Sequence, residues 1–305
     1  ALSVDLYNEW FVAFAPAAFR ETRAKTTTWV EDTLRATQNL TDIGPQILRQ
    51  NPAVLPTLRM ATCPPLARDR LVGLAGVSKS MVQRMEKEGK LPAGKTGAAL
   101  DAELARITSI ISKLADRDVF PWLGRDAAPN EAELHRAATI VADRLCGATT
   151  DPIIRNAQEA RQLKRIGEWL DAHGYRSLQP GSGAKFGEMP PATYAFHVNV
   201  PAALSEGGGM VNIPMDVVIM RRNAKLGEFP LFLEAKSAGD FTNVNKRRKE
   251  EAKKVGQLRG TYGDRIEYVL FLSGYFDSGY LGYEAADGID WVWEHRIDDL
   301  AEFRL

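Results

Sequence analysis

Two apolar segments interrupted by charged residues place the strongest constraint on the fold. Residues 211–219 read as one strand that carries a single carboxylate, Asp216. Residues 231–236 read as a second strand that ends in Glu234 and Lys236. Residues two apart project from the same face of a strand, and strand pairing would bring Asp216 beside the other two. Because charges in buried strands are costly unless they are paired or hold a metal, this pattern predicts a polar site built into a sheet.

Two carboxylates and one lysine suit the hydrolysis of a phosphodiester bond. Carboxylate oxygens hold hard cations such as Mg²⁺, and such a cation acidifies water and offsets developing negative charge. A surface hairpin with a salt bridge would show the same residue types, so the motif alone is a weak signal. Three contexts favour a site: the acids lie in apolar strands, the Glu-x-Lys closes its strand, and a basic helix follows.

The second half of the chain predicts an α/β core. A helix is expected to start at Asp151-Pro152, because aspartate caps helices and proline suits the first turn. A glycine- and proline-rich loop at 179–191 follows, which either orders over DNA or simply connects elements. Alternating apolar residues then predict five strands, with one charged helix at 243–262 between the third and the fourth. The strands are expected at 194–200, 210–221, 229–235, 266–272 and 289–293.

The first half of the chain reads as helical, because apolar residues recur at three- and four-residue spacing. Asn130 is expected to cap a helix, and Trp10, Phe14 and Trp29 are expected in the core. A domain boundary is placed near residue 150, where glycine and proline gather. The predicted domains are therefore a helical domain at 1–150 and a catalytic domain at 151–305. The helical segments are expected at 2–19, 28–40, 100–114 and 131–145.

Residues 67–90 resemble a helix-turn-helix element. Gly76 would form the turn, Val77 would be buried and Ser78 would cap the second helix. Plain helical packing also produces such helix pairs, so DNA reading is a hypothesis for this segment. The positions expected to face bases and phosphates are Lys79, Ser80, Gln83 and Arg84.

Charge is concentrated near the predicted site, although the 305 residues carry a net charge of zero. Residues 236–265 contain nine basic and four acidic residues. Basic residues at the start of a helix oppose its dipole, and a DNA phosphate would relieve that mismatch. The alternative is a solvated face on which Glu250 and Glu251 pair within the helix. The residues expected to contact DNA here are Asn243, Asn245, Lys246, Arg247, Arg248 and Lys249.

Other site classes find little support. The four histidines, at 135, 173, 197 and 295, are scattered, so no histidine-rich metal cluster is expected to compete with the carboxylates. Two cysteines predict neither a disulfide framework nor a zinc site. No apolar run reaches the roughly 18 residues that a spanning helix needs. A cytoplasmic protein without a membrane partner or an organic cofactor is therefore expected.

The segments 213–216 and 232–243, continuing through 246–251, resemble the XamI family of type II restriction endonucleases. The resemblance implies a PD-(D/E)xK core, a mixed central sheet flanked by helices, although Met215 here separates Pro214 from Asp216. It further implies that Asp216, Glu234 and the Ala235 carbonyl bind the metal and that Lys236 is the catalytic lysine. Many relatives add an acid from the preceding helix. Glu159 is the candidate, and the alternative is a solvated surface glutamate.

The expected function is site-specific, Mg²⁺-dependent hydrolysis of double-stranded DNA at a short palindrome. One set of catalytic residues cuts one strand, so a homodimer is expected to cut both. Two alternatives remain open: a repair or recombination nuclease of the same fold, and a non-catalytic DNA-binding regulator.

Overall fold

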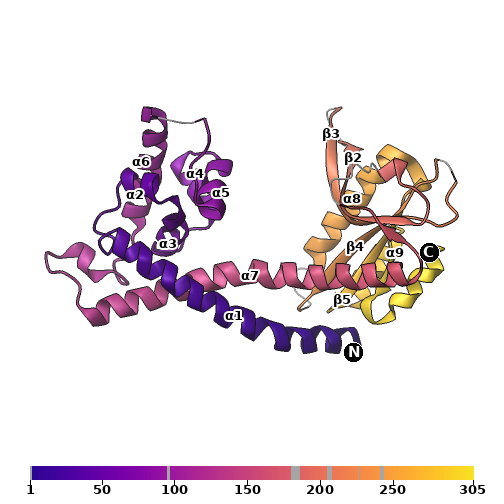
Figure 1. Cartoon of the computed structure of the whole chain (residues 1–305), viewed down its shortest axis with the longest axis horizontal. Helices are drawn as coiled ribbons and strands as arrows, with labels where there is room; N and C mark the ends of the chain where they lie inside the picture. Colours follow the sequence, from indigo (N-terminus) through magenta and orange to yellow (C-terminus); the bar gives the residue numbers. More distant parts are fainter. Residues whose placement is uncertain (1, 95–96, 180–185, 205–207, 226, 241–243) are drawn as a thin grey trace. The chain divides into compact units, whose positions relative to one another are not determined.

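The computed structural model describes residues 2–94, 97–179, 186–204, 208–225, 227–240 and 244–305, with the backbone alone for 186 and 244–248. The chain forms two compact units (Figure 1). One is helical and comprises Ala15–Ile153, and the other is an α/β unit of Ala1–Phe14 and Ile154–Leu305.

The helical unit is built around fully buried aliphatic and aromatic side chains, including Leu58, Leu104 and Phe120. Between its helices lie two 3₁₀ turns, Pro52–Val54 and Pro121–Gly124. Asn130 caps as predicted: its Oδ1 accepts a hydrogen bond from the Glu133 amide at 2.9 Å, and Glu133 accepts one from the Asn130 amide at 3.0 Å. The helices are part of α1 (Leu2–Ala36), α2 (Pro45–Gln50), α3 (Leu55–Met60), α4 (Arg68–Ala75), α5 (Lys79–Glu88), α6 (Gly97–Leu114) and part of α7 (Glu131–Ala172).

Two sequence predictions about helix ends are wrong. The segments expected at 2–19 and 28–40 form one helix, α1. Helix α7 runs through Gly147 and Pro152, so Asp151-Pro152 does not start a new helix. A proline inside a helix removes one backbone donor and disfavours the helix, but the apolar spacing continues on both sides, and tertiary packing overrides local propensity.

Helices α4 and α5 form the helix pair that the sequence indicates. Gly76 ends α4 in the left-handed conformation with φ 59°, Val77 is buried, and Ser78 Oγ accepts a hydrogen bond from the Met81 amide at 3.3 Å. The buried Glu86 on α5 forms ion pairs with Arg59 of α3 and Arg68 of α4. This charge network fixes the two helices to their neighbour.

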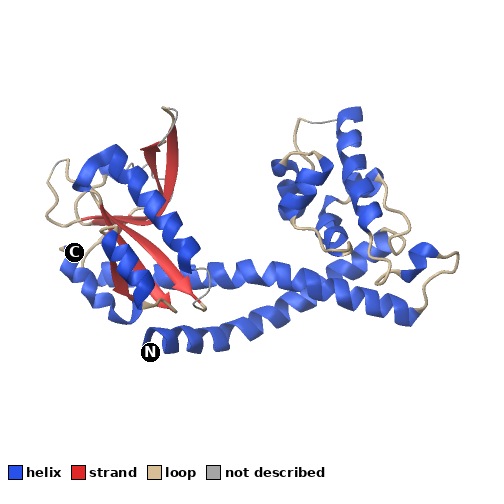
Figure 2. Cartoon of the chain, turned by 180° about the vertical axis from the view of Figure 1, so that it is seen from behind, coloured by secondary structure: helices blue, strands red, loops and turns tan. Residues whose placement is uncertain are grey.

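The α/β unit contains a six-stranded mixed sheet in the order β1 to β6 (Figure 2). Strands β2, β3 and β4 are antiparallel neighbours, whereas β4, β5 and β6 are parallel, as are β1 and β2. The five predicted strands are confirmed, with a short β1 added. The strands are β1 (Arg176–Ser177), β2 (Thr193–Ala203), β3 (Met210–Met220), β4 (Leu231–Ala238), β5 (Glu267–Gly274) and β6 (Asp290–Trp293).

Helices cover both faces of this sheet. The second part of α7 packs Leu163, Ile166 and Leu170 against one face, and α8 (Val244–Tyr262) packs Val255 and Leu258 against the other. Helix α9 (Ser278–Ala286) follows β5, and 3₁₀ turns at Phe186–Glu188, Gly263–Arg265 and Glu294–Phe303 complete the unit. Within the described residues, no helix is long and apolar enough to cross a membrane.

The expected core positions of the aromatic residues hold only in part. Trp10 and Phe14 are half-buried on α1 and stack on each other, with ring centroids 5.3 Å apart. Trp29 is 50% exposed, so its expected burial is wrong.

Candidate active site

A histidine and two acids lie on one rung across three strands. The neighbours of His197 on β2 pair with the neighbours of Asp216 on β3, so these two residues face each other. Val217 pairs with Leu233, and the same register places Asp216 opposite Glu234 on β4. Sequence periodicity alone indicated that Glu234 and Lys236 share a face of their strand. The register of the sheet adds that Asp216 and His197 lie on the same rung as Glu234.

Strands β2 and β3 both change the face that they bury at this rung. On β2, Phe196 packs with the α7-side cluster and Val198 with the α8-side cluster. On β3, Val217 packs on the α7 side and Met215 on the α8 side. Residues two apart normally share a face, and the left-handed φ of 54° at His197 accounts for the change. Such a conformation costs about 1–3 kcal/mol.

The carboxylate of Asp216 is held by a hydrogen bond from β4, and nearby acids disfavour its ionised form. Its Oδ2 accepts a hydrogen bond from the Ala235 amide at 2.9 Å. Burial, which has the largest effect, and the carboxylates of Glu234 and Glu159 together raise the pKa of Asp216 to about 6, against the lowering effects of the Ala235 amide and the Lys236 charge. A group that brings positive charge to this cluster would therefore bind most tightly to the ionised acid.

Glu234 is 4% exposed and only half of its carboxylate is satisfied. Its Oε1 accepts hydrogen bonds from Lys236 at 3.0 Å and Lys254 at 2.6 Å. Its Oε2 is buried and has no hydrogen-bond partner within the described part of the chain. Because buried polar atoms are nearly always satisfied, an orphaned carboxylate oxygen beside a second acid fits the donor set of a hard cation.

Lys236 lies between two carboxylates. Its Nζ is 3.0 Å from Glu234 Oε1 and 2.8 Å from Glu251 Oε1. Burial lowers the pKa of this ammonium, but Glu234 and Glu251 outweigh burial and raise its pKa above the ordinary value. Lys236 therefore stays protonated at neutral pH and acts through its charge and its hydrogen bonds.

Glu251 on α8 is 3% exposed, so it does not lie on a solvated face of the basic helix. Its Oε2 accepts a hydrogen bond from the Tyr268 hydroxyl of β5. Burial and the nearby carboxylates of Glu234 and Glu251 raise the pKa of Tyr268 well above its ordinary value, so it remains a donor. The sequence indicated Glu251 only as a possible ion-pair partner on a solvated helix face and did not single out Lys254. The only signal for the site was their three-residue spacing, which puts both on one face of the helix.

Gln162 ties α7 to the strands that carry the site. Its side chain is 1% exposed, and its Nε2 donates to the carbonyls of Lys236 at 3.3 Å and Phe271 at 3.1 Å. One turn of helix before it, the position of Glu159 brings that carboxylate toward Asp216. Buried bridges of this kind hold the backbone of β4 against α7.

Glu159, His197 and Asp216 each offer a ligand atom, and these atoms all lie within 4.8 Å of one another. Glu159 thus lies where the sequence hypothesis needs it. The sequence predicted no histidine-rich cluster and did not single out His197, which lies beside Asp216. The only sign of its role in the sequence was its position in the strand predicted at 194–200. Its pairing with Asp216 depends on the register between β2 and β3.

The residues expected to contact DNA are described only in part. Lys79 and Ser80 are exposed on α5, and Gln83 and Arg84 are partly buried. Lys79 pairs with Asp69 at 3.2 Å, and Arg84 with Glu88 at 3.4 Å. On α8, Lys249 is exposed. Asn243 and the side chains of Asn245, Lys246, Arg247 and Arg248 lie outside the described residues.

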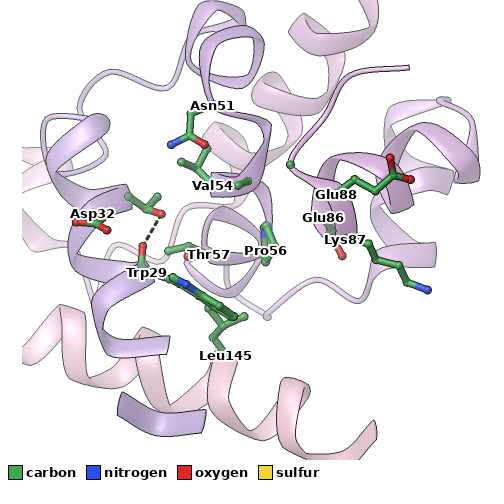
Figure 3. A pocket seen from close by; sticks show the side chains of 13 residues that line it. Trp29, Asp32, Asn51, Val54, Pro56, Thr57, Glu86, Lys87, Glu88 and Leu145 are labelled. Atoms are coloured by element: carbon green, nitrogen blue, oxygen red, sulfur yellow. Dashed lines mark hydrogen bonds between the residues drawn. The ribbon is translucent and has the colours of Figure 1, made fainter. Parts of the chain in front are cut away.

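A pocket of about 410 Å³ in the helical unit is lined by the half-exposed Trp29 together with Asn51 and Glu86 (Figure 3). Glu86 is already neutralised by two arginines. Asp32 and Glu88, the other acids that line it, pair with Arg35 and Arg84, so this pocket does not present a cluster of unpaired acids like that of the sheet rung.

A family model and a relative of known activity indicate one family. A family model described as XamI restriction endonuclease matches residues 38–293. The chain is 52% identical over 301 residues to the type II restriction enzyme SalI of Streptomyces albus G, which covers 98% of this chain and 93% of that enzyme. The crystal structure of protein VC1899 from Vibrio cholerae has 13% identity and a TM-score of 0.27, with 95% of this chain and 56% of that chain covered. That likeness is too weak to define the fold.

Proposed function

The chain belongs to the XamI restriction endonuclease family, and we propose that it cuts double-stranded DNA by metal-dependent hydrolysis at the rung of Asp216 and Glu234. Family membership makes it a type II restriction endonuclease that cleaves DNA at specific sites. Of the functions that the sequence left open, membership favours this one over a repair nuclease or a DNA-binding regulator.

The observation that carries the proposal is that Glu234 has an unsatisfied carboxylate oxygen and lies beside Asp216, an acid with a raised pKa. These two acids, with the Ala235 carbonyl and Glu159, would hold Mg²⁺ through oxygen ligands, which is the ligand type that this ion prefers. When bound, the cation supplies Lewis acidity, which acidifies water and offsets charge on the phosphate. The donor set fits this role because two carboxylates this close destabilise each other's ionised form.

Lys236, Glu251 and Tyr268 would stabilise the transition state and position the groups that do so. The Lys236 ammonium, held protonated between Glu234 and Glu251, would donate to the attacking water or to a phosphate oxygen and stabilise the transition state. Glu251 positions that ammonium, and Tyr268 in turn orients Glu251. We further propose that this sheet with its acids and lysine is a PD-(D/E)xK core. In the usual motif the proline directly precedes the aspartate, whereas here Met215 separates Pro214 from Asp216.

DNA binding would use two cationic helices. We propose that residues 246–249 at the start of α8 contact phosphates, because the basic run opposes the helix dipole. The α4–α5 pair would contact DNA through Lys79, Ser80, Gln83 and Arg84. Its geometry, a capped second helix after a left-handed glycine, supports this role.

Plasmid cleavage with and without Mg²⁺ tests the proposal. The wild type should give discrete fragments with Mg²⁺ and none in EDTA. Glu234→Ala should abolish cleavage and leave specific binding largely intact, whereas the control Glu168→Ala, an exposed residue on α7, should cleave normally. Complete degradation would indicate a repair nuclease, no cleavage would indicate a regulator, and full activity in EDTA would exclude the metal mechanism.

We also propose that the enzyme acts as a homodimer on a short palindrome. The described residues hold one rung of acids with one lysine, which cuts one strand. Two-fold symmetric DNA is matched most simply by a two-fold symmetric dimer. Sedimentation with a cognate duplex should give two chains per duplex. A complex of one chain and one duplex, with nicked plasmid accumulating as an intermediate, would contradict the dimer.

A further inference from the structure

His197 has an unusual backbone conformation for a residue in the middle of a strand. It lies in the middle of β2, its φ of 54° is left-handed, and it faces Asp216 across the hairpin. The side chain is exposed, and within the described part of the chain no hydrogen bond or ion pair holds its ring. The imidazole is therefore free to bind a ligand beside Asp216.

The distances fit a common ion. Two ligands of one cation at 2.0–2.4 Å from it are separated by at most about 4.8 Å. The ligand atoms of Glu159, His197 and Asp216 all lie within 4.8 Å of one another. The three come from α7, β2 and β3, so the set is assembled by the fold and not by one local segment.

A second observation points to a ligand at this place. Asp216 lies beside Glu159 and His197, and it also faces the buried Glu234 on β4. The Oε2 of Glu234 has no hydrogen-bond partner among the described residues. Lys236 and Lys254 contact this glutamate through its Oε1 and leave its Oε2 unsatisfied. An ion bound by Asp216 would therefore lie on the same rung as an acid whose second oxygen has no partner among the described residues.

We propose that His197 supplies a nitrogen ligand, together with Glu159 and Asp216, to the divalent cation of the catalytic centre. The inference rests on the proposed metal-dependent function and adds a ligand from β2 to it. A mixed nitrogen and oxygen set has a chemical consequence, because imidazole suits first-row transition metals whereas Mg²⁺ and Ca²⁺ prefer oxygen. The site should therefore bind Mn²⁺ or Co²⁺ more tightly than Mg²⁺, and His197 should be the cause of that preference.

Pulsed electron paramagnetic resonance of the full chain with Mn²⁺ is the direct test. Electron spin echo modulation from a coordinated ¹⁴N is expected in the wild type, and incorporation of ¹⁵N-histidine should replace it by the ¹⁵N pattern. His197→Ala and His197→Asn should lose the modulation, while the control His135→Ala, exposed in the helical unit, should keep it. Because the wild type alone reports on the ligand, misfolding of a variant would not leave the question open.

Calorimetric titration with Mn²⁺ and Mg²⁺ gives the energetic counterpart. His197→Asn should weaken Mn²⁺ binding by about tenfold or more and weaken Mg²⁺ binding less. Bound Mn²⁺ without nitrogen modulation, in an enzyme that cleaves with Mg²⁺, would overturn the histidine ligand and leave the proposed function intact. Absence of any divalent cation binding would overturn both.

Discussion

The acids at the sheet rung and beside it on α8 lie in an environment opposite to that of the cations on α5. The side chains of Glu234 and Glu251 are 5% and 3% exposed. On α5, Lys79 is 59% and Arg84 37% exposed, and their acidic partners are exposed as well. Surface ion pairs contribute at most about 1 kcal/mol, whereas a buried charge that loses its partner is strongly destabilised. The buried acids are therefore held in place by their partners in the folded chain, whereas the exposed ion pairs of α5 can break at little cost.

Removal of the Lys236 charge should give the largest effect in this comparison. Lys236→Ala is expected to lower the single-turnover rate at saturating enzyme by roughly 10²–10³-fold, because a fixed charge stabilises the transition state. DNA affinity measured without Mg²⁺ should change little. The matched control Lys253→Ala, exposed on α8, should keep the wild-type rate. An unchanged rate in the Lys236 variant would make this lysine merely structural.

Glu251 should act on the rate through Lys236. Glu251→Gln keeps the shape of the side chain and removes the charge beside the ammonium. Loss of such a positioning partner is expected to lower the rate by roughly 10–100-fold, with KM nearly unchanged. Glu250→Gln, one residue earlier and exposed, serves as the control. A rise in KM at constant kcat would instead place Glu251 in DNA binding.

The α5 cations should change affinity and leave the chemical step alone. Replacing Lys79 and Arg84 by alanine is expected to reduce the slope of log K against log salt by about one unit for each phosphate that is no longer neutralised. Cleavage at saturating enzyme should remain at the wild-type rate. Lys113→Ala, exposed at the end of α6, should leave the slope unchanged. The same slope in the wild type and the double variant would remove α5 from the DNA interface.

The smallest expected effect is on stability. The pKa of Asp216 is raised from 3.8 to about 6, so the folded protein binds this proton more tightly than the unfolded chain does. The ionised acid therefore costs stability above pH 6, at most about 3 kcal/mol in the absence of metal. That cost disappears as pH falls from about 6 toward 4.

Asp216→Asn in EDTA should consequently raise the unfolding temperature of the α/β unit at pH 8 by a few degrees. The gain should vanish near pH 4, where the wild-type acid is protonated. Asp290→Asn, at an exposed position of β6, is the control for the loss of one charge. A constant difference at all pH values would mean that the ionisation of Asp216 is not its cause.

Local pattern was sufficient for the strands and for part of the rung. Alternation of apolar residues located β3 and β4 within a few residues of their observed bounds, because a strand repeats every two residues whatever its neighbours are. The same period placed Glu234 and Lys236 on one face. Capping chemistry likewise located the start of α7 at Asn130 and the turn at Gly76.

Only tertiary structure brought His197, Glu251 and Gln162 to Asp216, Glu234 and Lys236. These contacts join α7, β2 and α8 to β3 and β4, and they depend on strand register and on which helix face turns inward. The passage of α7 through Pro152 has the same origin, since packing along a 42-residue helix outweighs one missing backbone donor. Side-chain periodicity is a property of the local backbone, whereas convergence on a site is a property of long-range pairing, and no single segment of the sequence encodes that pairing.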